Sequence, residues 1–125
     1  MTCPPDSSGP DKRAIGFAGE DVAARWLEDN DFQLLARNWR AGRYELDIVA
    51  LGPGGVIHFV EVKTRKPGAL TAPEEAITYA KFASLLPAAR SWLARHAPDA
   101  ESQFDLIAVQ GNEVRYVPNA MVPSW

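Results

Sequence analysis

A chain of 125 residues with 46% apolar content is long enough for one compact domain and leaves little room for a second. Its net charge of −3 counts against tight non-specific binding to nucleic acid, because affinity for phosphates depends on cations that displace counterions. The single cysteine, Cys3, excludes a disulfide framework and a cysteine-based zinc site, and no apolar run approaches the roughly 20 residues of a membrane span.

Composition divides the chain into a central domain, expected over residues 13–118, and two tails, residues 1–12 and 119–125. The first tail is rich in Pro, Ser and Gly and is predicted to be disordered. It lacks the basic and apolar regions of a signal peptide. We therefore expect a cytoplasmic protein with no membrane segment.

The first predicted element is a helix over residues 13–29, with Phe17 and Leu27 on one apolar stripe. Glu20 lies on the same stripe, where a carboxylate is costly unless it has a partner. Gly19 beside it permits a close approach of another backbone. Two interpretations of Glu20 have equal weight: it enters a polar site on the sheet, or it lies at the edge of the stripe and reaches water.

Three strands are predicted next. The first covers residues 32–37, and residues 38–42 are expected to form a turn. The second and third cover residues 44–51 and 56–63, and a Gly-Pro-Gly-Gly sequence, which is strong turn chemistry, joins them.

The second half of the chain predicts a helix followed by one or two strands. Thr71 is expected to cap a helix that runs toward His96, and Pro87 should kink this helix or divide it in two. Residues 104–109 predict a buried strand, and a turn then leads into residues 114–117. This order of elements predicts an α/β fold, a sandwich around a mixed central sheet.

Charged residues lie inside the second and third strands, among apolar neighbours. Because side chains alternate along a strand, Glu45 and Asp47 share one face, and Glu61 and Lys63 share one face. Two carboxylates with a lysine suit one task above others: the carboxylates hold Mg²⁺ or Mn²⁺, the metal activates a water, and the lysine neutralises charge on a phosphate. The pattern predicts a nuclease site with Asp47, Glu61 and Lys63 as its catalytic residues.

The connection between these strands decides whether the charges meet. Pairing of Leu51 with Val56 would put the two acids on opposite faces of the sheet. Pairing of Leu51 with Ile57 would put Asp47 opposite Glu61. The site therefore requires an odd-numbered connection or a bulge, which the loop composition permits but does not compel.

The structural alternative is a cross-strand ladder. In it Glu45 pairs with Lys63 and Asp47 pairs with a nearby arginine, each pair worth well under about 1 kcal/mol. That ladder would leave Asp47 and Glu61 face to face without a cation, which is repulsive. The balance favours metal, with Glu45 as an additional candidate ligand.

Cations gather around these acids. Between residues 37 and 66 six cations stand against three anions, so the segment becomes positive if metal neutralises the acids. An ordinary solvated surface explains any single one of them. The candidate contacts to substrate are Arg37, Arg40, Arg43, Arg65 and Lys81.

Three further residues have both a functional and a structural interpretation. Asp105 is either a further ligand or, by preference, the partner of an arginine under the sheet. His58 lies on the opposite strand face from Glu61, which favours packing over catalysis. Trp39, which has arginines around it, is the tryptophan worth testing as a base-stacking platform.

Short motifs follow one another in order from about residue 14 to residue 117. They are Gly16-Phe17-Ala18-Gly19-Glu20, Arg37-Asn38-Trp39-Arg40, Glu45-Leu46-Asp47-Ile48-Val49-Ala50, Phe59-Val60-Glu61-Val62-Lys63-Thr64-Arg65, Pro73-Glu74-Glu75-Ala76-Ile77 with Lys81, and Phe104-Asp105-Leu106-Ile107. Together they resemble the YraN-type family of bacterial proteins. The resemblance implies a restriction-endonuclease-like fold with the order α-β-β-β-α-β, and the same acids are similar to the site of archaeal Holliday-junction resolvases.

The resemblance also implies roles for particular residues. Glu20, Asp47 and Glu61 would bind metal together with the Val62 carbonyl, and Lys63 would be catalytic. Resolvases act as symmetric dimers because a junction offers two related strands, so by analogy the resemblance implies a homodimer.

Two functions remain in competition. The first is a Mg²⁺-dependent deoxyribonuclease that acts on branched or otherwise structured DNA. The second is a non-catalytic module that retains the nuclease fold and binds a nucleic acid or a protein. The acidic pI of about 5.3 favours the second, and the complete set of Asp, Glu and Lys favours the first. Tyr44 stands where the family usually has glycine. The larger side chain can narrow the space through which a DNA backbone approaches the site.

Overall fold

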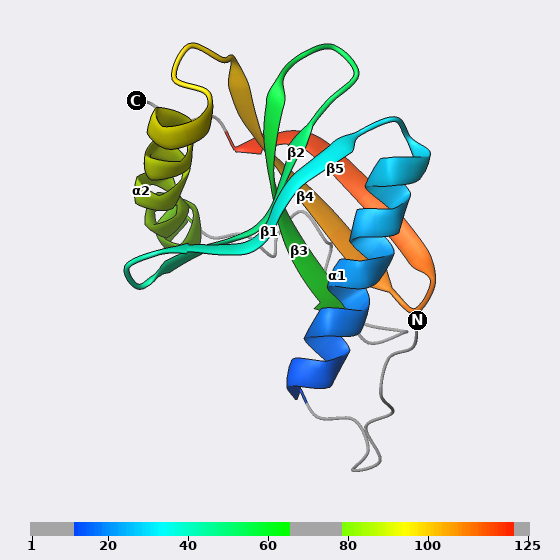
Figure 1. Ribbon diagram of the computed structural model, residues 1–125. Helices are drawn as coiled ribbons and strands as arrows, with labels where there is room; N and C mark the ends of the chain where they lie inside the picture. The colour runs from blue at the N-terminus through cyan, green and yellow to red at the C-terminus, as the bar shows by residue number, and fades with distance from the viewer. Residues whose placement is uncertain (1–11, 66–78, 122–125) are drawn as a thin grey trace, which may run out of the picture.

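The computed structural model describes residues 12–65 and 79–121 (Figure 1). In chain order its elements are α1 (Lys12–Asp29), β1 (Gln33–Ala41), β2 (Tyr44–Leu51), β3 (Ile57–Arg65), α2 (Tyr79–His96), β4 (Ser102–Gln110) and β5 (Glu113–Met121). The expected order of a helix, three strands, a helix and one or two strands is confirmed, and the structure has two strands after α2. The last strand continues past Pro118, where the domain was expected to end.

The five strands form one mixed sheet in the order β1-β2-β3-β4-β5. β3 and β4 are parallel, and every other neighbouring pair is antiparallel. Parallel neighbours need a crossover connection, and here it contains α2 (Figure 1). Antiparallel neighbours are joined by short turns, which Gly42, Gly55 and Gly111 allow by adopting positive φ.

The two helices cover opposite faces of the sheet (Figure 1). Adjacent residues of β3 separate into two apolar clusters: Phe59 packs with Phe82 and Trp92 of α2, and Val60 packs with Leu27 of α1. This alternation is the period of a strand that is buried on both faces. The result is an α/β sandwich around a mixed sheet, as the sequence predicted.

The β2–β3 connection has the register on which the site depends. Leu51 pairs with Ile57, and the ladder continues to the pair of Ile48 and Val60. The five residues 52–56 therefore form the odd-numbered connection, and the Gly52 amide donates to the Val56 carbonyl across it. This is the register that was predicted to turn Asp47 toward Glu61.

The turn expected over residues 38–42 is wrong, because β1 continues to Ala41. Trp39 pairs with Leu46, and Ala41 pairs with Tyr44, so that the turn is formed by Gly42 and Arg43. Asn38 nevertheless has the positive φ of 51° that is typical of a turn. The strand continues through this residue.

Pro87 does not divide α2, which runs unbroken from Tyr79 to His96. The apolar residues before and after the proline, Leu85 and Ala88 among them, belong to one core cluster against the sheet. Packing against the sheet thus supports one continuous helix despite the missing amide donor. The cap expected at Thr71 lies outside the described residues.

Neither helix in the described ranges is long and apolar enough to cross a membrane.

Candidate functional site

The candidate site forms where β2 and β3 separate. Their ladder ends at the pair of Ile48 and Val60, although both strands continue beyond it. In the gap, the backbone amide of Val62 donates a hydrogen bond to Asp47 Oδ2 at 3.0 Å. A carboxylate thus occupies the space between two strands, close to backbone groups that a continuous ladder would have used.

Asp47 and Glu61 form a hydrogen-bonded pair of acids. Glu61 is only 6% exposed, and its burial, together with the charge of Asp47, raises the pKa of its carboxyl from 4.5 to about 8. Both causes favour the protonated form of Glu61, which donates a hydrogen bond to Asp47. The proton removes the repulsion that the sequence led us to expect between two facing carboxylates.

Two lysines approach Glu61 from different elements. Lys63 lies two residues further along β3, on the same face, and its charge lowers the pKa of Glu61. Lys81 reaches across from α2, with its Nζ 3.5 Å from Glu61 Oε2 and its side chain 44% exposed. Of the two, only Lys63 was expected to be catalytic. Lys81 was expected to contact substrate, whereas in the structure it contacts Glu61.

Glu20 lies near this group on α1 and is largely shielded from water. Its side chain is 15% exposed, and burial and the charge of Asp47 raise its pKa, while a hydrogen bond with the Asn38 side chain lowers it. Among the described residues its buried Oε1 has no hydrogen-bond partner, and the nearest cation, Arg37 Nη2, is 4.0 Å away. Of the two interpretations of Glu20, the structure supports the polar site.

Gly19 explains how Glu20 comes so close to the sheet. A methyl group built at Gly19 would overlap Thr64 Oγ1 and lie within 3.4 Å of the Thr64 Cβ and Cγ2. A residue with a side chain would push α1 away from β3. The glycine therefore seats the helix directly against the strand that carries Glu61 and Lys63.

The arginines expected to contact substrate lie around the acids and mostly pair with other groups. Arg37 bonds Asp21 Oδ1 at 2.8 Å, and Arg40 Nη2 lies 3.7 Å from Glu45 Oε1. The ladder alternative paired Glu45 with Lys63, whereas its ion pair here is with Arg40. At the β1–β2 turn, the guanidinium of Arg43 lies 5.4 Å from the ring centroid of Tyr44. Arg65 is the last residue of β3.

The donor set fits a hard divalent cation, although it is not gathered around one point. Within residues 12–65 and 79–121, no three His, Cys, Asp or Glu side chains converge as a ready-made metal site. The available donors are carboxylate oxygens, which Mg²⁺ and Mn²⁺ prefer. Asp47 and Glu61 are already in contact, and the buried Glu20 Oε1 lacks a hydrogen-bond donor among the described residues.

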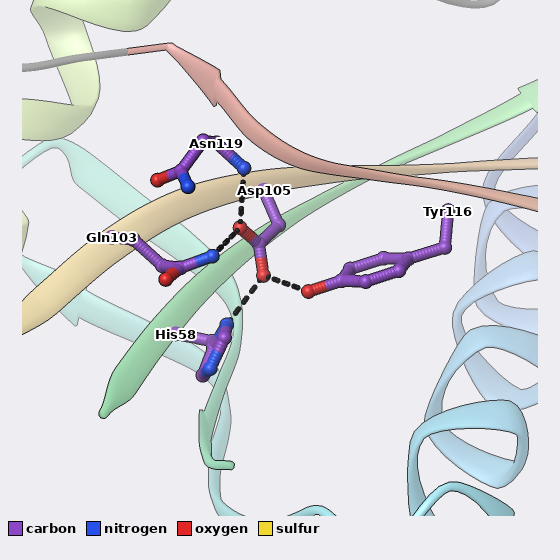
Figure 2. Close-up of polar contacts among 5 residues, drawn as sticks. All are labelled: His58, Gln103, Asp105, Tyr116 and Asn119. Carbon is purple, nitrogen blue, oxygen red and sulfur yellow. Dashed lines mark hydrogen bonds and ion pairs between the residues drawn. The ribbon is translucent and has the colours of Figure 1, made fainter. Parts of the chain in front are cut away.

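A second polar cluster, on the face of the sheet that α1 covers, centres on Asp105 (Figure 2). Asp105 is 1% exposed and accepts four hydrogen bonds from the groups around it. The donors and distances are His58 Nδ1 at 2.6 Å, the Tyr116 hydroxyl at 2.6 Å, Gln103 Nε2 at 2.8 Å and the Asn119 backbone amide at 3.0 Å.

These bonds keep Asp105 ionised. Burial alone would raise its pKa, but the hydrogen bonds, that of His58 first, lower it below 3.8. An ionised carboxylate only accepts, so His58 Nδ1 carries the proton of this bond. The prediction that Asp105 pairs with an arginine is wrong, while the preference for a structural role for Asp105 and for packing of His58 agrees with this buried network.

Sequence reasoning missed this network because its members are far apart in the chain. The one local signal was an aspartate inside the buried run of residues 104–109, which must have partners. Which partners it has depends on the register of β4 against β3 and β5. That register includes an irregularity between Phe104 and Leu106, opposite which Asn119 adopts a φ of 51°.

Comparisons with known proteins agree on a family and on little else. A family model described as "Uncharacterised protein family UPF0102" matches residues 19–109. A UPF0102 protein of Beutenbergia cavernae is 48% identical over 99 residues, which make up 78% of this chain and 83% of the relative. A UPF0102 protein of Nitratidesulfovibrio vulgaris is 46% identical over 99 residues, covering 78% and 73% of the two chains. One of Bacteroides fragilis is 37% identical over 113 residues, covering 87% and 93%.

Among solved structures, the chain is similar to "The structure of Pyrococcus Furiosus SfsA in complex with Ca2+". The identity is 17% and the TM-score is 0.38, and the match covers 86% of this chain and 64% of that one. The chain thus spans less than two thirds of SfsA. A likeness of this size carries no argument about fold or ligand.

Proposed function

We propose that this chain, which belongs to the uncharacterised protein family UPF0102 as its YraN-type motifs implied, is a divalent-metal-dependent endonuclease for branched or otherwise structured DNA. One observation carries the proposal. Asp47 and Glu61 lie in hydrogen-bond contact in the gap between β2 and β3, with Lys63 on the same face of β3 as Glu61. We assign the fold to the restriction-endonuclease-like class on the same grounds, supported by the order of elements and the parallel β3–β4 pair.

The residues have separate roles in this proposal. Asp47, Glu61 and Glu20, with the Val62 carbonyl, would hold Mg²⁺ or Mn²⁺, since all offer hard oxygen ligands. A bound cation of this kind supplies Lewis-acid stabilisation of the phosphate and activates water for attack. The Lys63 ammonium neutralises negative charge that develops on the phosphate.

The cations around the site provide for the DNA backbone. Arg37, Arg40 and Arg43 lie along β1 and its turn, and Arg65 lies at the end of β3. Once a divalent cation neutralises the acids, this part of the surface attracts phosphates more strongly. A homodimer belongs to the same proposal, because the two related strands of a junction call for two equivalent sites.

A second candidate function is a non-catalytic binding module. The observation that favours it is that the acids are satisfied without metal. Protonated Glu61 donates a hydrogen bond to Asp47, and Lys81 Nζ lies 3.5 Å from Glu61 Oε2. A former nuclease site that no longer binds metal would also need its acids stabilised by a proton and a nearby lysine.

Metal binding is the first test between the two candidates. Mn²⁺ or Mg²⁺ should raise the melting temperature of the wild type, because a ligand that binds only the folded state stabilises it. Asp47→Asn and Glu61→Gln should abolish that rise, while Lys63→Ala should keep it. If neither metal changes the melting temperature of the wild type, the proposal of a metal-dependent nuclease loses its basis.

Cleavage is the second test. Labelled four-way junctions, flaps, single strands and duplexes are incubated with the protein and Mn²⁺ at low salt. The nuclease predicts cleavage of at least one branched substrate, and Lys63→Ala should lose cleavage while it retains metal. If junctions bind but none is cut, the protein is a binding module. If nothing binds, the nucleic-acid function should be abandoned.

A further inference from the structure

Lys81 has a position that its role as a substrate contact does not explain. It extends from the exposed side of α2 and brings its Nζ to 3.5 Å from Glu61 Oε2, a carboxylate that is 7% exposed. A divalent cation bound to Glu61 would be a second positive charge at the same oxygen. Two cations at this separation repel each other, and the repulsion is strong where the carboxylate is buried.

The base of Lys81 is fixed by packing, while its side chain is partly exposed to water. The next residue, Phe82, is buried and meets the ring of Phe104 edge-on at 5.0 Å between centroids, which anchors this turn of α2 to the sheet. The Ser84 hydroxyl donates to the Lys81 carbonyl at 2.6 Å. The side chain itself is 44% exposed, so water can solvate its ammonium when a cation displaces it from Glu61.

We infer that Lys81 is a displaceable cation: it lies beside Glu61 in the metal-free protein, and a divalent cation takes its place and releases the ammonium toward a phosphate of the substrate. The metal half of this inference concerns the chain's own acids and lysine. The phosphate half rests on the proposed nuclease function. Lys63 differs, because it shares a strand face with Glu61 and remains beside the site in either state.

The test of the metal half is calorimetric titration of Mn²⁺ into four proteins: wild type, Lys81→Met, Lys81→Arg and Arg95→Met. Methionine keeps the length and helix propensity of the side chain but removes its charge. Arg95 lies in the last turn of the same helix, so its replacement controls for the change in net charge. Lys81→Met should bind Mn²⁺ about two- to fivefold more tightly than wild type, the range for loss of one partly exposed ion contact.

The controls make this result specific. Arg95→Met and Lys81→Arg should both stay close to wild type, and melting temperatures in EDTA should show that all four proteins are folded. Equal affinity in Lys81→Met and Arg95→Met, weaker binding in Lys81→Met, or no Mn²⁺ binding by any of the four would overturn the exchange. Binding that appears only in Lys81→Met would support it.

The phosphate half is tested by junction cleavage at saturating Mn²⁺. Lys81→Met should cut at least tenfold more slowly than Arg95→Met, although it binds metal more tightly. A rate loss of this size is expected when one charged contact to the reacting phosphate is removed. Equal rates would overturn the phosphate role. If no protein cuts DNA while Lys81→Met still gains Mn²⁺ affinity, the nuclease proposal fails and the exchange at Glu61 stands.

Discussion

At the scale of single residues, burial decides which acids of the site carry charge. Glu61 and Asp105 are both almost inaccessible to water, yet the pKa of Glu61 is raised and that of Asp105 is lowered. The difference lies in their neighbours. Glu61 faces another carboxylate, whereas Asp105 accepts four hydrogen bonds. The first arrangement depends on a proton that a cation can replace, and the second is complete in itself.

The raised pKa of Glu61 predicts a pH dependence of stability. In the folded protein this pKa is about 8, against 4.5 for the ordinary carboxyl. The stability that the protonated group contributes is fully present below about pH 4.5 and is lost as the pH rises through about 8, on the order of a few kcal/mol in total. Urea unfolding in EDTA at about pH 5, 7 and 8.5 measures this loss.

Glu61→Gln serves as the matched variant for that experiment. The amide has the shape of the protonated acid and does not ionise, so the loss of stability between about pH 5 and 8.5 should shrink, and the variant should exceed wild type at the upper end. Parallel pH profiles for the two proteins would show that Glu61 ionises normally and that the pairing with Asp47 is weak.

The Asp105 network predicts a graded cost of mutation. Tyr116→Phe removes one donor and leaves three, so it should cost about 1–2 kcal/mol of unfolding free energy. Asp105→Ala leaves four donors without their acceptor and should cost about 3 kcal/mol or more. Chemical denaturation at neutral pH compares them. A smaller cost for Asp105→Ala than for Tyr116→Phe would contradict a structural centre at Asp105.

At the scale of elements, the contact of α1 with β3 is set by a single glycine. Gly19→Ala would improve helix propensity, yet the added methyl overlaps Thr64, and we expect a net loss of about 1–3 kcal/mol. The double variant Gly19→Ala with Thr64→Ala removes the overlapping Oγ1 and Cγ2 and should recover most of that loss relative to Thr64→Ala alone. Additive costs in this double-mutant cycle would argue against a tight contact.

Within α2, Pro87 lowers the stability of the helix, and packing against the sheet offsets this loss. The residue is exposed and lies inside an unbroken helix, where it removes the hydrogen bond to the carbonyl four residues earlier. Pro87→Ala should therefore raise the unfolding free energy by about 1–2 kcal/mol, after allowance for the stiffer unfolded chain of the wild type. Thermal and urea unfolding test this. A lower stability would mean that the helix needs the bend that a proline introduces.

At the scale of the whole molecule, charge determines how DNA can bind at all. A chain of net charge −3 needs local concentration of its cations, and the three acids lie among them. A divalent cation at the acids should therefore raise affinity for a four-way junction several-fold and leave a steep dependence on salt. Fluorescence anisotropy with Mn²⁺ and with EDTA measures the change. Asp47→Asn should reduce the effect of Mn²⁺ on junction affinity. If Mn²⁺ does not change the junction affinity of the wild type, the DNA-binding surface lies elsewhere on the molecule.

Much of the fold could be predicted because its signals are local. The second strand was placed with the bounds that β2 has, and a Gly-Pro-Gly-Gly sequence marked the turn after it. The helix of residues 13–29 differs from α1 by one residue at its start. Periodicity and turn chemistry act over a few residues, so the chain displays them without knowledge of its partners. The candidate acids Asp47 and Glu61 could be identified in the same way, because charge inside an apolar strand is a local anomaly.

Long-range contact decided the rest. The sequence allowed two registers for β2 and β3, and only the folded sheet selects the one that joins Asp47 to Glu61. Asn38 has turn chemistry yet lies within a strand, because pairing with β2 holds β1 together on both sides of it. The approach of Lys81 to Glu61 and the four donors around Asp105 join residues from different elements, and no spacing along the chain encodes them. By itself the sequence determined which elements form and where charge is buried; the tertiary structure decided which charges meet, because such contacts depend on packing and register across the whole sheet.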